Sequence, residues 1–192
     1  LFSEKQFVEK GLDLLKIGCS ILDVGGESTR PGAKEISSKR EIERVIGVIE
    51  KIKMSAPSAM ISVDTRKALV AEKALQSGAS LVNDISAGSF DKKMFNVVAK
   101  YKAGICLMHS KGLPENMQNK PYYDNVLFDI YDYFEKKISQ AECEGIPKEK
   151  ILIDPGIGFG KSLSHNIEII KKVGLFIGLG CPIIIGPSRK SF

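Results

Sequence analysis

The run SILDVGG (residues 20–26), followed directly by Glu27-Ser28-Thr29-Arg30, shows the pattern that decides the fold: a short apolar run and then polar side chains. The pattern returns in five further runs, namely MISVDT (60–65), SLVNDIS (80–86), GICLMHS (104–110), KILIDPG (150–156) and PIIIGPS (182–188). Continuous apolarity without alternation is typical of strands buried on both faces. The sequence therefore predicts six buried strands.

Helical patterns separate these runs. Apolar residues three or four positions apart occur within 8–15, 42–52 and 127–138. Ser38-Lys39-Arg40-Glu41 predicts a capping box at the start of the second helix, and Gly18 and Gly78 stand where helices should end. Strands that alternate with helices indicate βαβ units and a parallel sheet.

A parallel sheet is either an open, doubly wound sheet or a closed barrel, and the polar residues favour the barrel. In an open sheet only two or three strands at the switch point carry the site, whereas in a barrel all strand ends surround one mouth. Here polar residues follow nearly every predicted strand. We expect an α/β fold, a TIM (β/α)₈ barrel with about six of its eight units in this chain. Residues 1–192 would form one partial domain that lacks the first and last strands.

Composition excludes several classes of protein. The chain has 192 residues, 43% of them hydrophobic, and a net charge of 28 − 23 = +5. The longest apolar stretch, 175–185, is too short to span a membrane, and no signal-peptide pattern is visible. The positive charge is too diffuse for a nucleic-acid footprint and suits anionic small molecules. Four cysteines without a CxxC pair argue against zinc or disulfides and favour a reduced, cytoplasmic location.

The glycine-rich segment IDPGIGFGK (153–161) is similar to a phosphate-binding loop but fails both known patterns. Pro155 stands where a P-loop needs its first glycine, and Lys161 takes the third glycine position of a dinucleotide motif. What remains is Asp154 at a strand end and glycines that permit a close backbone approach. Phe159 either covers a flat ligand or folds into the core.

Other strand-end residues also allow a structural interpretation. Asp64 is either a ligand or the N-cap of a helix that starts near Arg66, and Asn83-Asp84 either binds a ligand or forms an Asx turn. His109 is either functional or simply satisfied by its neighbours. The segment GGESTRPGA (25–33) is either a substrate loop or a plain connection, and His165 receives no role.

The strand ends combine two kinds of chemistry. Carboxylates and an amide suit a planar two-donor edge such as a 2-amino-pyrimidinone, whereas cations and hydroxyls suit a phosphate or carboxylate. The sequence offers no Cys/His or Ser/His pair for a covalent nucleophile, so direct transfer is expected. The first group comprises Asp64, Asn83 and Asp154, and the second comprises Arg30, Arg189, Lys190 and Ser191.

The motifs ILDVGGESTRPGA, ISVDTRK, LVNDIS, LMHSKGLPENMQ, ILIDPGIGFGK and GPSRKSF resemble, in order and spacing, those of the dihydropteroate synthase family. The resemblance covers the whole chain. It implies a barrel that condenses 6-hydroxymethyl-7,8-dihydropterin diphosphate with 4-aminobenzoate to 7,8-dihydropteroate and diphosphate in folate biosynthesis. It also implies inhibition by sulfonamides and a homodimer.

The resemblance further implies individual roles. Asp64, Lys190 and Arg30 would act in catalysis, with Asp64 stabilising a pterin cation as diphosphate leaves. The pterin would be bound by Asp64, Asn83, Met108, Asp154, Gly186 and Lys190. The 4-aminobenzoate and diphosphate would be bound by Thr29, Arg30, Pro31, Phe159, Lys190 and Ser191.

Two family features are absent from this sequence. The Asn-containing first strand, which would help to bind Mg²⁺, and an Arg-x-His motif on the last strand are not found. The resemblance implies Mg²⁺ as a cofactor, but no residue of this chain can be named as its ligand. Two alternatives remain at this point, a pterin-binding methyltransferase domain and a non-catalytic paralogue.

Overall fold

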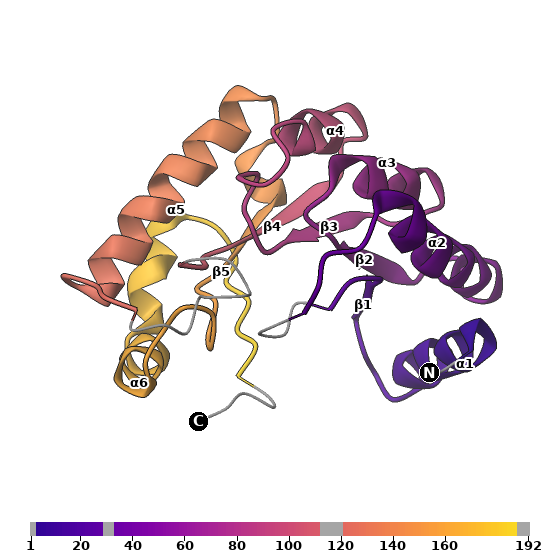
Figure 1. The fold of residues 1–192 in the computed structure, drawn as a ribbon, viewed down its shortest axis with the longest axis horizontal. Coiled ribbons are helices and arrows are strands. Elements are labelled where there is room, and N and C mark those ends of the chain that lie inside the picture. The colour runs from indigo at the N-terminus through magenta and orange to yellow at the C-terminus, as the bar shows by residue number, and fades with distance from the viewer. Residues whose placement is uncertain (1–2, 29–32, 112–120, 188–192) are drawn as a thin grey trace.

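The computed structural model describes residues 3–28, 33–111 and 121–187. Five strands form one sheet in the order β1-β2-β3-β4-β5, and every neighbouring pair is parallel. Each strand lies beside the one that precedes it in the chain (Figure 1). The strands are β1 (Ile21–Gly25), β2 (Met60–Asp64), β3 (Leu81–Asp84), β4 (Gly104–Met108) and β5 (Ile151–Asp154).

Helices alternate with these strands and lie side by side along the outer face of the curved sheet (Figure 1). This arrangement confirms the expected α/β class and forms five successive strands of a barrel wall. The α-helices are α1 (Glu4–Lys16), α2 (Ser38–Ser55), α3 (Ala68–Gln76), α4 (Met94–Lys100), α5 (Val126–Cys143) and α6 (Leu163–Lys171), and two 3₁₀ helices cover Lys148–Lys150 and Val173–Leu179.

The hydrophobic core fills the space between the sheet and these helices. Ile49 of α2, Val63 of β2 and Phe134 of α5 are completely buried. Burial of each such side chain stabilises the fold by roughly 1.5–3 kcal/mol. No helix in the described ranges is long and apolar enough to cross a membrane. All four cysteines are free thiols.

The sixth predicted strand does not form as a strand within the described residues. PIIIGPS makes a single parallel bridge, in which Ile183 pairs with Ile153 of β5. The Ile153 amide donates to the Pro182 carbonyl at 3.0 Å, and the Ile184 amide donates to the Ile153 carbonyl at 2.8 Å. Pro182 itself has no amide to donate, which shortens the ladder at its start. Ser188 and the residues after it lie outside the described ranges.

The predicted capping box of α2 is also wrong by one residue. The N-cap is Ser37, whose hydroxyl accepts from the Arg40 amide at 3.3 Å, and Ser38 is already helical. With Ser37 as the N-cap, the third helical position is Arg40, so Glu41 stands one residue too late to complete the box, and its side chain instead contacts Lys67. The expected helix ends are confirmed, since Gly18 and Gly78 both adopt positive φ angles just past α1 and α3.

Candidate active site at the strand ends

The predicted polar residues meet at the carboxyl edge of the sheet. Asp64 ends β2, where its register partners are Gly25 of β1 and Asn83 of β3. Met108 at the end of β4 pairs with Asp154 at the end of β5, and the next amide, His109, donates to the Asp154 carbonyl at 2.9 Å. The structure therefore brings four of the predicted pterin residues onto adjoining strand ends.

The remaining predicted residues are less informative. Gly186 is described and exposed, three residues beyond the Ile183 bridge. Phe159 lies on the loop after β5, within the described residues. The other predicted residues lie outside the described ranges, and these are Thr29, Arg30, Pro31, Arg189, Lys190 and Ser191.

Asp23 is a site residue that the sequence analysis missed. Its carboxylate accepts from the Asn83 side-chain amide at 3.0 Å, which links β1 to β3 across β2. Burial raises the pKa of Asp23 above its ordinary range. Asp23 also lines a cavity of about 750 Å³ between α1 and β1. The signal was present in the sequence, because Asp23 is the only charged residue within the apolar strand ILDVG.

Asp64 does not cap a helix, so that structural interpretation is wrong. The N-cap position of α3 is Lys67, which makes no side-chain capping bond, and the Ala68 amide donates instead to Asp91 at 2.9 Å. Burial and the nearby carboxylates, Asp23 first among them, raise the pKa of Asp64 from 3.8 to about 8. In the free site Asp64 is therefore mostly protonated near neutral pH, and a positive charge beside it would favour release of the proton.

Asp84 has a structural role in a turn, whereas its neighbour Asn83 does not. The Asp84 carboxylate accepts from the Ser86 amide at 2.8 Å and from the Gly88 amide at 2.7 Å. Asp84 therefore forms the Asx turn that the sequence offered as the alternative to a ligand role. Asn83 is half-buried and directs its amide toward Asp23.

Lys161 is the second residue that the sequence analysis missed. It is almost fully buried, and its Nζ lies 2.9 Å from His109 Nδ1, 3.2 Å from the His109 carbonyl and 3.0 Å from the Phe159 carbonyl. Burial lowers the pKa of Lys161 to about 7, although Asp154 opposes the shift. Burial and Lys161 also lower the pKa of His109. The contact with Lys161 gives the His109 ring a partner, as the structural interpretation expected. Lys161 therefore fastens the loop after β5 to the end of β4.

Two glycines make this close approach possible. Gly156 has φ +69°, and a Cβ there would lie 1.9 Å from the His109 carbonyl oxygen. Gly160 has φ +62°, and a Cβ there would lie 2.2 Å from the Lys111 carbonyl oxygen. Asp154 Oδ1 accepts from the Gly156 amide at 2.8 Å, so the loop also orients the carboxylate. Phe159 is half-buried on this loop and is not part of the closed core.

His165 has a structural place, in agreement with the absence of a predicted role. It completes a capping box with Ser162 at the start of α6. Among the described residues, no group of three or more His, Cys, Asp or Glu side chains is arranged to hold a metal ion.

Comparison with known proteins agrees with this geometry. Residues 1–192 match the family described as "Pterin binding enzyme". The chain belongs to the pterin-binding enzyme family. Among its relatives, the dihydropteroate synthase of Synechocystis sp. is 40% identical over 185 residues, which are 96% of this chain and 64% of that protein. The dihydropteroate synthase of Escherichia coli K12 is 43% identical over 178 residues, which are 93% of this chain and 62% of that protein.

Solved structures of dihydropteroate synthases share the fold. The Yersinia pestis enzyme in a sulfonamide drug complex superimposes with a TM-score of 0.95 at 39% identity, covering 98% of this chain and 68% of that one. The Xanthomonas albilineans enzyme with 4-aminobenzoic acid gives a TM-score of 0.89 at 38% identity, covering 96% of this chain and 64% of that one. The chain thus spans somewhat less than two thirds of the length of these curated relatives.

Proposed function

We propose that the full-length protein is a dihydropteroate synthase, a transferase of folate biosynthesis. It condenses 6-hydroxymethyl-7,8-dihydropterin diphosphate with 4-aminobenzoate and releases diphosphate. The observation that carries the proposal is the set of Asp64, Asn83 and Asp154 on adjoining strand ends. Carboxylates paired with an amide suit the donor-rich edge of a 2-amino-pyrimidinone.

Within this proposal, Asp154 binds the amino-pyrimidinone edge of the pterin. Its carboxylate is oriented by the Gly156 amide at the start of the loop after β5, and Lys161 fastens that loop to the end of β4. Met108, buried to 3% exposure, lines the wall beside it. Asn83 and, from outside the described residues, Lys190 complete the pterin contacts, with Gly186 as a further wall residue.

The chemical step is a direct transfer in which diphosphate leaves before the amine adds. Positive charge then develops on the pterin next to Asp64. Because burial and like charges hold Asp64 protonated in the free site, the developing cation is the group that favours its ionised form. Asp64 gives up its proton to the departing diphosphate, a basic anion, and the ionised carboxylate that remains in a dry pocket stabilises the cation strongly.

The second substrate is assigned from family resemblance. Thr29, Arg30 and Pro31 after β1, Phe159 after β5, and Lys190 with Ser191 would bind 4-aminobenzoate and diphosphate, with Arg30 and Lys190 acting in catalysis. Phe159 is the one of these residues that the structure describes. The relatives solved with 4-aminobenzoic acid and with a sulfonamide support these compounds as a substrate and an inhibitor of this protein.

Asp154→Asn in the full-length protein tests pterin recognition. The variant removes one partner of a charged hydrogen bond worth about 1.5–3 kcal/mol, so pterin affinity should fall by about tenfold to a hundredfold. Calorimetric titration with the pterin substrate measures the loss. Asp13→Asn, which changes an exposed carboxylate on α1, is the matched control. Unchanged pterin affinity in Asp154→Asn would remove Asp154 from the site.

Three further properties of the full-length protein are proposals from resemblance. Mg²⁺ would assist at the diphosphate, and its removal by a chelator should abolish synthesis. A homodimer should be seen by sedimentation. A cytoplasmic location is supported by the four free cysteines, since unpaired thiols persist in reduced compartments.

A further inference from the structure

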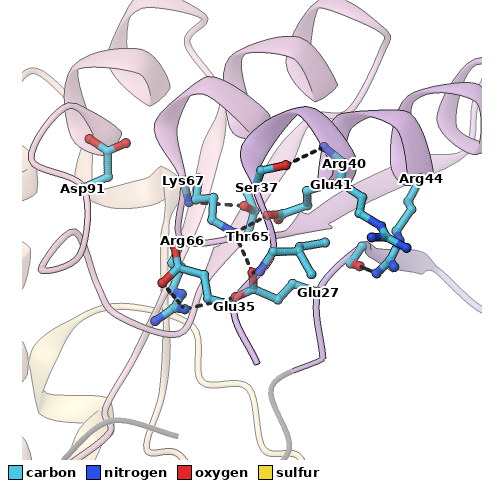
Figure 2. A network of polar contacts seen from close by, with 12 residues as sticks. Glu27, Glu35, Ser37, Arg40, Glu41, Arg44, Thr65, Arg66, Lys67 and Asp91 are labelled. Atoms are coloured by element: carbon cyan, nitrogen blue, oxygen red, sulfur yellow. Dashed lines mark hydrogen bonds and ion pairs between the residues drawn. The ribbon is translucent and has the colours of Figure 1, made fainter. Parts of the chain in front are cut away.

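A buried network of charges joins three elements just outside the strand-end site (Figure 2). Glu27 follows β1, Glu41 lies in the first turn of α2, and Lys67 precedes α3. The Lys67 ammonium lies 2.5 Å from Glu27 Oε2 and 2.7 Å from Glu41 Oε2. The side chains of Lys67, Glu27 and Glu41 are only 7%, 11% and 1% exposed.

Glu27 also ties together the two ends of the connection between β1 and α2. Its Oε2 accepts from the Ile36 amide at 3.0 Å, across nine residues of chain. Its Oε1 accepts from Arg66 at 3.1 Å, and Arg66 reaches Glu35 at 3.4 Å on the far side of the connection. The Arg66 guanidinium carbon also lies 4.1 Å from the centroid of the Phe90 ring, and this cation–π contact helps to hold the guanidinium in place.

The charges of this network depend on one another. Burial opposes the charged form of both Glu27 and Lys67. Hydrogen bonds from the Ile36 amide and Lys67 nevertheless lower the pKa of Glu27. The carboxylates of Glu27 and Glu41 in turn raise the pKa of Lys67. A buried charge persists only when it is paired and hydrogen-bonded. Removal of Lys67 therefore leaves two buried carboxylates without their shared cation, and Glu27 loses the partner that holds it beside Ile36.

The network adjoins the candidate site without belonging to its predicted ligands. Lys67 follows Asp64 by three residues, and Glu27 follows the register partner of Asp64, Gly25, by two. Arg44 of α2 strengthens the same junction, because it donates to the Gly26 carbonyl at 2.7 Å. The ends of β1 and β2 are thus joined by side chains as well as by their backbone ladder.

We propose that Lys67 is a positioning residue for the amine substrate: it holds both ends of the β1–α2 connection, through Glu27 and Glu41, against the end of β2. This inference rests on the proposed function, because the connection carries the residues assigned to 4-aminobenzoate. Among the pterin residues, Asp64 is near enough to the network for Glu41 and Glu27 to raise its pKa, whereas Asn83, Met108 and Asp154 belong to β3, β4 and β5. Loss of the network should therefore affect the two substrates unequally.

The test is Lys67→Met in the full-length protein, compared with Lys100→Met. The control removes a lysine that pairs with Glu72 at 2.8 Å on the exposed surface. In Lys67→Met we expect KM for 4-aminobenzoate to rise by about tenfold to a hundredfold, as for a substrate group misplaced by about 1 Å. The Kd of the pterin substrate should change by less than about fivefold, through the coupling of Glu27 and Glu41 to Asp64. The Ile36 amide should also exchange with solvent at least about tenfold faster, because its acceptor is released. Lys100→Met should leave all three quantities unchanged.

A second variant, Glu27→Gln, addresses the case in which Lys67→Met does not fold. It keeps an oxygen acceptor for Ile36 and Lys67 but removes one charge, so the same shifts are expected at smaller size. Unchanged KM for 4-aminobenzoate, or equal weakening of both substrates, in the folded variant would overturn the positioning role. Wild-type protein that makes no dihydropteroate would instead refute the proposed function. In that case the exchange rate of the Ile36 amide in Lys67→Met would still test whether Lys67 holds Glu27 in place.

Discussion

Raising the pH from about 6 to about 8 is expected to destabilise the protein through Asp64, and Asp64→Asn is expected to remove this effect. The carboxyl is buried among Asp23, Glu41, Asp84 and Glu27, so the folded protein holds its proton up to a pKa of about 8. The unfolded chain releases the same proton near pH 3.8. Stability from this group is therefore complete at low pH and is lost as the pH rises through about 8.

The magnitude follows from linkage. Each pH unit in which only the unfolded state is deprotonated costs about 1.4 kcal/mol. The folded group is still half protonated at a pH equal to its pKa, so the loss between about pH 6 and about pH 8 amounts to about 2 kcal/mol. Asp64→Asn carries no titrating proton and resembles the protonated acid in shape, so it should gain this amount relative to wild type over the same range.

Urea unfolding of the full-length protein at the two pH values measures the difference. The comparison with Asp64→Asn isolates this one group, because Asp23 and Asp84 titrate in both proteins. Asp13→Asn, on the surface of α1, should follow the wild-type profile. Parallel profiles for wild type and Asp64→Asn would show that Asp64 ionises freely in the folded protein and would refute the reasoning.

Three further predictions concern the loop after β5 and the core. Lys161→Met should raise the pKa of His109, measured by NMR titration of its ring, because the cation that opposes protonation is removed, and an unshifted titration would contradict the contact. Gly156→Ala should destabilise by about 2 kcal/mol or more through its clash and positive φ, whereas Gly145→Ala, with φ +90° and only an ordinary contact with Ala99 at 3.9 Å, should cost less in the same thermal melt. Phe134→Ala should cost about 3–5 kcal/mol in urea unfolding, far more than Phe128→Ala on the exposed side of the same helix.

Strands buried on both faces were predictable from the sequence because their own composition reports their environment. The runs ending at Asp64, Asp84 and Asp154 each became a strand within a few residues of the expected bounds. The run PIIIGPS has the same composition but forms one bridge, since a strand also needs a continuous partner edge and Pro182 withholds a donor. The composition of a run indicates whether it is buried, whereas its pairing as a strand depends on the neighbouring strand edge.

The candidate site was predicted where one residue interrupts an apolar run, and missed where distant residues cooperate. Asp64, Asn83 and Asp154 stand out locally at strand ends. Glu27 and Lys67 are 40 residues apart, and each alone is typical of an exposed charged position. In the sequence, Lys161 stands out only because it replaces a glycine of a dinucleotide-binding motif. Its burial depends on the close approach of β4 and the loop after β5, which the sequence does not show.

The sequential strand order has a consequence for how the chain assembles as it is synthesised. Each of β2, β3, β4 and β5 pairs with the strand made immediately before it, and α2 and α3 likewise pack against the preceding helix. During synthesis, each βα unit therefore emerges after the unit against which it packs. Folding can thus advance from the N-terminus one βα unit at a time. Growth of this kind adds each strand to the edge formed by the strand before it and shields that edge, so that on the growing side of the nascent sheet only the newest strand is open to pairing with another chain.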